Sequence, residues 1–195
     1  MTQSTSPRLA VIGCGYWGAN HVRTLGEMGV LHAVSDVHIE RAEMLAQPFG
    51  AKGVMPDEVF ADAAVDAVVL ALPAHVHAEF ALRAIADGKH VFVEKPLSLS
   101  SADGAHVVEQ AATAGKVLMT GHILCYHNAF VALRERIAAG DLGEIRYIQS
   151  HRLGFGKFHA RFDALWDLAP HDLSMIMTLA GGEPERVQGV HRGVS

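Results

Sequence analysis

Short apolar runs alternate with segments of helical periodicity along the first 121 residues of the chain. Several of these runs are apolar at every position, which is typical of strands buried on both faces of a sheet. The predicted strands occupy residues 9–12, 30–36, 52–55, 65–73, 90–94 and 116–121, and the predicted helices occupy residues 19–28, 39–50, 57–61, 74–86 and 100–114. This alternation predicts an α/β fold with a parallel, doubly wound sheet.

The pattern changes after Gly121. Helices are predicted at residues 129–139 and 166–179, extended strands at 145–153 and 186–190, and a loop at 154–163. We therefore expect two domains, residues 1–121 and 122–195. A sheet of only two strands is marginally stable and leaves its edges exposed, so the second α/β domain is expected to be incomplete.

Composition narrows the class of protein. Of 195 residues, 50% are hydrophobic and 19% are charged, which is a globular composition. The net charge of −5 and the lack of Lys/Arg clusters argue against a nucleic-acid partner. The chain shows neither a signal-peptide pattern nor an apolar run near the roughly 20 residues of a membrane helix. Two distant cysteines predict a reduced, cytoplasmic protein, and the 13 scattered histidines predict no metal site.

A glycine motif, GCGYWG at residues 13–18, follows the first predicted strand and opens a helix. Gly13 permits a tight turn, Gly15 permits close approach of a pyrophosphate, and Gly18 permits close packing of the helix on the sheet. Asp36 ends the second predicted strand, where its carboxylate can accept both ribose hydroxyls and would repel a 2′-phosphate. The motif therefore predicts a dinucleotide site that prefers NAD to NADP. The alternative is a glycine turn without a ligand.

A second motif, HVFVEKPLSLS, places Glu94 and Lys95 at the carboxyl end of the fifth predicted strand. Ligands of an open parallel sheet bind at these carboxyl ends, so Lys95 is expected to point into the cofactor crevice. Its ammonium could hydrogen-bond a substrate hydroxyl and favour the alkoxide as hydride leaves. The alternative is a solvated lysine that pairs with Glu94.

The third motif, WDLAPHDLSM, places an acid and an imidazole four residues apart. If Asp167 caps the helix, Pro170 falls in its first turn and His171 follows on the same face. Proximity to the helix N-terminus disfavours the protonated imidazole, which suits a neutral general base. The alternative is a helix cap beside a core histidine whose hydrogen bonds are satisfied.

Together the chain resembles the Gfo/Idh/MocA oxidoreductases, which join a Rossmann domain to an α/β domain. The resemblance rests on the segments VIGCGYWGAN, DAVVLALPAHVH, GKHVFVEKPLSL, VLMTGHILCYHNAF, GDLGEIRYI and LWDLAPHDLSMI. It implies that Lys95, Asp167 and His171 are catalytic. It also implies a set of cofactor contacts, at Gly13, Gly15, Tyr16, Trp17, Gly18, Asp36, Leu72, Pro73, His77, Glu94 and Lys95. His122 and Tyr126 would contact the substrate, although both could equally serve interdomain packing.

The resemblance further implies oxidation of a secondary sugar hydroxyl with NAD as hydride acceptor. The motifs GYWGAN, GHILCY and LWDLAPHDLS look most like the branch that acts on nucleotide-sugars such as UDP-N-acetylglucosamine or its uronate, at C3. Members of the family continue beyond residue 195, and their second sheet commonly mediates oligomerisation, so a homo-oligomer is expected. The alternative is a non-catalytic fragment that binds a dinucleotide or nucleotide-sugar and self-associates through exposed strand edges.

Overall fold

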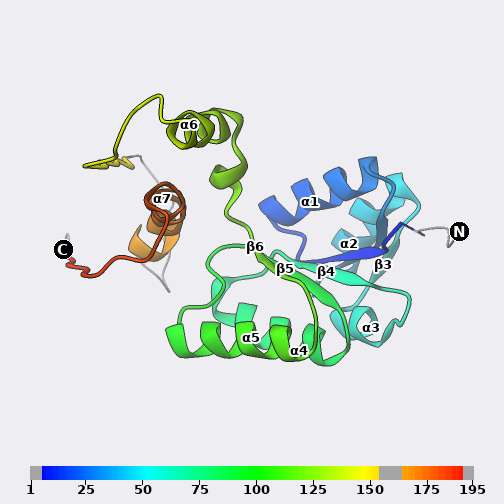
Figure 1. Cartoon of the computed structure of the whole chain (residues 1–195). Coiled ribbons are helices and arrows are strands. Elements are labelled where there is room, and N and C mark those ends of the chain that lie inside the picture. Colours follow the sequence, from blue (N-terminus) through cyan, green and yellow to red (C-terminus); the bar gives the residue numbers. More distant parts are fainter. Residues whose placement is uncertain (1–5, 154–163, 191–195) are drawn as a thin grey trace, which may run out of the picture. The chain divides into compact units, whose positions relative to one another are not determined.

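The computed structural model describes residues 6–153 and 164–190. Two compact units divide the chain, Met1–Gly121 and His122–Ser195. All six strands of the described residues belong to one parallel sheet in the first unit (Figure 1). Among the helices of the described ranges, none is long and apolar enough to cross a membrane.

The sheet has the strand order β3-β2-β1-β4-β5-β6. Its strands are β1 (Leu9–Ile12), β2 (Leu31–Ser35), β3 (Lys52–Val54), β4 (Ala67–Leu70), β5 (His90–Val93) and β6 (Leu118–Thr120). In the central register Ile12 of β1 aligns with Ser35 of β2 and with Leu70 of β4. This is the order of a doubly wound dinucleotide-binding sheet, and it confirms the predicted fold class of the first unit.

Alternate side chains of the strands bury into two separate hydrophobic cores. Ala10 and Ile12 of β1 pack with one core, whereas Val11 between them packs with the other. The first core is closed by α3 (Pro56–Ala61), α4 (His77–Ala86) and α5 (Ser101–Thr113), and the second by α1 (Tyr16–Glu27) and α2 (Ile39–Ala46) (Figure 1). Burial of both sheet faces explains why the strands are almost continuously apolar.

Two predicted helices are divided in the structure. The 3₁₀ turn η1 (Gln47–Phe49) follows α2 because Pro48 interrupts the helical pattern, and η2 (Ala74–Val76) precedes α4. The sheet itself reverses its winding between β1 and β4, which are neighbours in space. Their crossover helices lie on opposite faces, so the carboxyl ends of these two strands border the crevice in which ligands of such sheets bind.

The second unit is helical in its described residues. It contains the 3₁₀ turn η3 (Ile123–Tyr126) and the helices α6 (Asn128–Ala138) and α7 (Ala164–Ala180). The strands predicted at 145–153 and 186–190 are wrong for the described residues, where neither segment pairs with another strand. A strand is defined by its hydrogen-bonded neighbour, and these segments have none among the described residues. The loop predicted at 154–163 lies outside the described residues.

The start of α7 also differs from the prediction. The helix begins at Ala164, so Asp167 lies in its first turn and is not the N-cap. Pro170 consequently lies inside the helix, where it cannot donate the usual backbone hydrogen bond to the carbonyl of Trp166. His171 lies about two turns from the helix start.

Candidate functional site

The turn after β1 requires glycine at two positions, Gly13 and Gly18. Gly13 adopts a φ of +102° and donates its N–H to the carbonyl of Ser35 at 2.8 Å. A Cβ at Gly13 would lie 2.4 Å from the carbonyl oxygen of Ala71, and one at Gly18 would lie 1.7 Å from the carbonyl oxygen of Gly13. The loop after β4 and the first turn of α1 are therefore packed directly against this turn.

Gly15 differs from its two neighbours in the motif because it faces open space. A Cβ at this position would have no heavy atom within 4 Å, and its φ of −68° is compatible with any residue. Gly15 is also the N-cap of α1, so the first backbone N–H groups of the helix begin beside this space. Such a cradle fits the pyrophosphate of a dinucleotide. Tyr16 and Trp17, both exposed, form an edge-to-face pair beside it, with ring centroids 5.6 Å apart.

Asp36 fixes the next loop of the crevice. Its side chain is buried, and its two carboxylate oxygens accept hydrogen bonds from the backbone N–H groups of Cys14 at 2.7 Å and His38 at 3.0 Å. Each carboxylate oxygen keeps a further lone pair, so the group can still accept from ribose hydroxyls. Burial, followed by the neighbouring Asp36, raises the pKa of the Cys14 thiol to about 12. Cys14 is therefore a packing residue of this turn.

Glu94 connects the end of β5 to α1. One carboxylate oxygen lies 2.8 Å from His21 Nε2, and the other accepts the backbone N–H of Lys95 at 3.3 Å. The ring of His21 packs edge-on against Phe92, with centroids 5.3 Å apart. A Cβ at Gly121 would approach the Glu94 carboxylate to 3.1 Å, so this carboxylate is held closely on that side. Sequence reasoning missed His21, since no motif spacing indicates a partner 73 residues from Glu94.

The loop after β4 lies at the same edge of the sheet, at the carboxyl end of its strand. The side chain of Leu72 lies next to Gly13, within 3.2 Å of where a Cβ would stand, and Pro73 is the N-cap of η2. His77, the first residue of α4, is 1% exposed. Its two ring nitrogens lie 2.7 Å from the carbonyl oxygen of Leu72 and 2.6 Å from that of Pro96. His77 therefore lies behind the loops that the sequence assigns to the cofactor.

The first unit thus gathers its predicted site residues at one edge of the sheet. They follow β1, β2, β4 and β5, and all four of these loops lie at carboxyl ends of parallel strands. The residues are Gly13, Gly15, Gly18, Asp36, Leu72, Pro73, Glu94 and Lys95. This is the edge at which doubly wound sheets bind nucleotides.

In the second unit, the predicted site residues lie on η3 and α7. His122 precedes η3, and Tyr126, at the end of η3, is 65% exposed. Cys125 Sγ lies 4.0 Å from the Thr178 hydroxyl, which links η3 to α7. Asp167 and His171 are four residues apart on α7, and this spacing places both on the same face of the helix.

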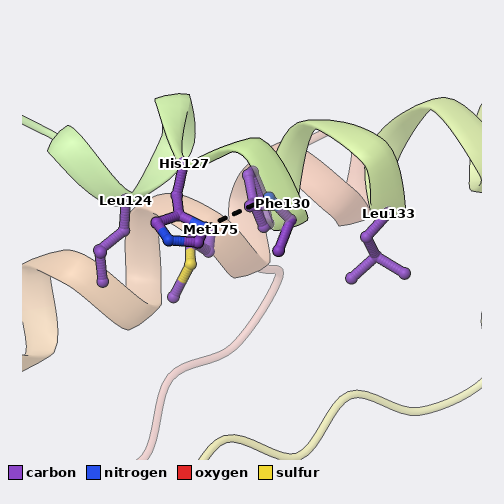
Figure 2. A pocket seen from close by; sticks show the side chains of 6 residues that line it. Leu124, His127, Phe130, Leu133 and Met175 are labelled. Carbon is purple, nitrogen blue, oxygen red and sulfur yellow. Dashed lines mark hydrogen bonds between the residues drawn. The ribbon is translucent and has the colours of Figure 1, made fainter.

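An apolar hollow lies between η3, α6 and α7. Figure 2 shows the residues that line it, which are Leu124, His127, Ala129, Phe130, Leu133 and Met175. His127 caps α6, because its Nδ1 accepts the backbone N–H of Ala129 at 3.2 Å (dashed line in Figure 2). Met175 follows His171 by four residues, so the face of α7 that carries Asp167 and His171 continues toward this hollow.

Asp172 of α7 holds the segment that carries Ser150 and Arg152. Its carboxylate accepts two hydrogen bonds from the guanidinium of Arg152, at 2.5 Å and 3.2 Å, and one from the Ser150 hydroxyl at 2.8 Å. The Arg152 hydrogen bond is the main cause that lowers the pKa of Asp172 below its usual range. Sequence reasoning did not single out Asp172, although it directly follows His171.

Comparison with known proteins assigns both units to one family. The NAD-binding Rossmann-fold domain of the GFO/IDH/MocA oxidoreductases matches residues 7–122. The chain belongs to the GFO/IDH/MocA oxidoreductase family. The C-terminal domain of the same family matches residues 130–194, which lie in the second unit, although the described residues of this unit contain no strand. The family expectation drawn from the motifs is confirmed.

Three proteins show which enzymes of the family this chain resembles and how much of each it covers. The UDP-N-acetylglucosamine 3-dehydrogenase of Acidithiobacillus ferrooxidans is 33% identical, over 94% of this chain and 57% of its own length. The scyllo-inositol 2-dehydrogenase (NAD(+)) of Bacillus subtilis is 30% identical, over 93% of this chain and 56% of its own length. GenD2 from gentamicin A biosynthesis, solved with NAD, superposes with a TM-score of 0.76 at 29% identity, over 90% of this chain and 54% of its own. The chain thus spans little more than half the length of these relatives.

Proposed function

We propose that this chain belongs to an NAD-dependent dehydrogenase that oxidises a secondary hydroxyl of a sugar. The observation that carries the proposal is the set of loops at the carboxyl ends of β1, β2, β4 and β5. There, an open cradle at Gly15, the buried Asp36 carboxylate and Lys95 follow strands of the same sheet. The inositol and amino-sugar dehydrogenases among the relatives support this reaction class.

In this proposal, separate residues stabilise charge, accept the proton and contact the substrate. Bound NAD supplies the hydride acceptor. Lys95 donates a hydrogen bond to the reacting hydroxyl oxygen and stabilises the negative charge that develops there. His171 accepts the hydroxyl proton, and Asp167, one helical turn away, holds the orientation of that ring. His122 and Tyr126 contribute substrate contacts from η3.

Three groups of residues hold the cofactor in this proposal. The helix start at Gly15 binds the pyrophosphate through backbone N–H groups, with Tyr16 and Trp17 beside it. Asp36 accepts the ribose hydroxyls and repels the extra phosphate of NADP, so NAD is preferred. The loops that carry Leu72, Pro73 and Glu94 border the nicotinamide.

For the substrate we propose a nucleotide-sugar. The amino-sugar nucleotide named for the Acidithiobacillus ferrooxidans relative, together with the GYWGAN and LWDLAPHDLS segments, favours this class over free polyols. A panel that contains UDP-N-acetylglucosamine, its uronate and scyllo-inositol discriminates between the two classes.

The test has a binding arm and a turnover arm. Isothermal titration with NAD+ should show one site on the wild-type chain, and addition of a substrate from the panel should generate NADH absorbance. Lys95→Met should keep NAD+ binding and abolish NADH formation. Lys52→Met, which changes an exposed lysine at the start of β3, is the matched control and should behave as wild type. NAD+ binding without NADH formation from any substrate would favour the alternative of a non-catalytic binding unit.

A further inference from the structure

A buried histidine, His77, joins two loops of the proposed cofactor crevice. The loop after β4 carries Leu72, and the loop after β5 carries Lys95 and Pro96. The two strands are neighbours in the sheet, with Leu70 aligned with Val93. Beyond these residues the ladder ends, so it does not fix the position of one loop relative to the other.

His77 bridges this gap. Its Nδ1 lies 2.6 Å from the carbonyl oxygen of Pro96 and its Nε2 lies 2.7 Å from the carbonyl oxygen of Leu72. A carbonyl oxygen can only accept, so a ring nitrogen that forms a hydrogen bond with it does so as the donor.

His77 presents almost no surface to a ligand in this arrangement. The residue is 1% exposed and both ring nitrogens are engaged by carbonyls. It is also the first residue of α4, a ten-residue helix that packs on β4 and β5. The ring is therefore attached to a rigid element while its hydrogen bonds hold the loops in front of it.

We propose that His77 is a positioning residue that clasps the Leu72 loop to the Lys95 loop and so sets the place of Lys95 beside the nicotinamide. The proposal rests on the proposed function, since positioning matters only where these loops contact NAD. It differs from the role implied by the family resemblance, in which His77 itself lines the cofactor.

The two hydrogen bonds can be removed separately. An asparagine amide reaches the position of a histidine Nδ1, and a glutamine amide reaches that of Nε2. His77→Asn should therefore keep the bond to Pro96, His77→Gln should keep the bond to Leu72, and His77→Phe should lose both. His90→Phe is the matched control, because His90 Nδ1 accepts the backbone N–H of Val117 at 2.9 Å at the opposite end of β5.

Hydrogen exchange read by mass spectrometry on the ligand-free chain tests the clasp without any turnover. In His77→Phe, amides of residues 72–75 and 95–98 should both exchange about tenfold faster than in wild type. His77→Asn should restore protection at 95–98 alone, and His77→Gln at 72–75 alone. His90→Phe should leave both segments unchanged. Equal protection of both loops in wild type and His77→Phe would overturn the proposal, as would Asn and Gln variants that do not differ.

Titration with NAD+ then tests whether the clasp serves the cofactor site. Affinity should fall about fivefold in His77→Phe and remain unchanged in His90→Phe. If the loop amides of His77→Phe exchange hydrogen faster while its NAD+ affinity is unchanged, the positioning role is overturned. A wild-type chain that fails to bind NAD+ would instead refute the proposed function, while the exchange experiment would still report on the clasp.

Discussion

Replacement of Gly15 by alanine separates folding from cofactor binding. A Cβ at this position meets no heavy atom within 4 Å, and the φ of −68° suits alanine. Alanine is a poorer N-cap than glycine, but it also restricts the unfolded chain. The two effects are of similar size, so the free energy of unfolding should stay within about 1 kcal/mol of wild type.

The same methyl group should weaken NAD+ binding strongly. A phosphate oxygen bonded to a backbone N–H lies about 2.9 Å from the nitrogen, and the new methyl stands in the space through which it approaches. Loss of one charge-assisted hydrogen bond costs about 1.5–3 kcal/mol, which corresponds to roughly tenfold to hundredfold weaker binding. Isothermal titration measures this loss, and urea denaturation measures stability.

Alanine substitutions at two other glycines serve as controls for the stability and the NAD+ affinity of Gly15→Ala. Gly18→Ala should destabilise the fold by about 1–3 kcal/mol, because its Cβ would lie 1.7 Å from a backbone oxygen. Gly104→Ala, inside α5 with its nearest neighbour at 3.8 Å, should stabilise by up to about 1 kcal/mol and leave NAD+ affinity unchanged. A Gly15→Ala chain that binds NAD+ as tightly as wild type would refute the placement of the pyrophosphate at Gly15.

Three further predictions concern Asp36, Asp62 and the cysteines. Asp36→Ser should weaken NAD+ binding about tenfold and improve NADP+ binding, as titration with both cofactors can show. The pKa of Asp62 is lowered below 3.8, first by the backbone N–H of Ala64. Its stabilisation is therefore present above that pH and is lost as the pH falls through the folded pKa, so the stability gap between wild type and Asp62→Asn should close in acid. Iodoacetamide at neutral pH should alkylate Cys125 in the native chain and Cys14 only after unfolding, as peptide mass spectrometry can test.

The first unit was predictable because its pattern is repeated and local. The central strands are buried on both faces, and most of the helices end just before a glycine or proline, so the sequence alone indicates six strands in the observed order along the chain. The site loops follow from the rule that ligands bind at carboxyl ends of parallel strands. Contacts such as His21 to Glu94 could not be predicted, because they depend on the packing of α1 over the sheet.

The second unit shows where local pattern fails. An alternating segment becomes a strand only beside a partner, and residues 145–153 have none among the described residues; Ser150 and Arg152 bond to Asp172 of α7 instead. The helix was predicted to start at residue 166, with Asp167 considered as its N-cap; Leu165 before it is also compatible with a helix, and α7 includes it.

Deuterium transfer tests most directly the claim that hydride passes from a nucleotide-sugar to NAD+. The chain is incubated with NAD+ and with UDP-N-acetylglucosamine deuterated at its ring carbons, and the reduced cofactor is analysed by mass spectrometry. The account predicts deuterated NADH from wild type and from Lys52→Met, and none from Lys95→Met or His171→Asn. If the wild-type chain binds NAD+ yet transfers no deuterium from this or any other nucleotide-sugar in the panel, the proposed hydride transfer is contradicted.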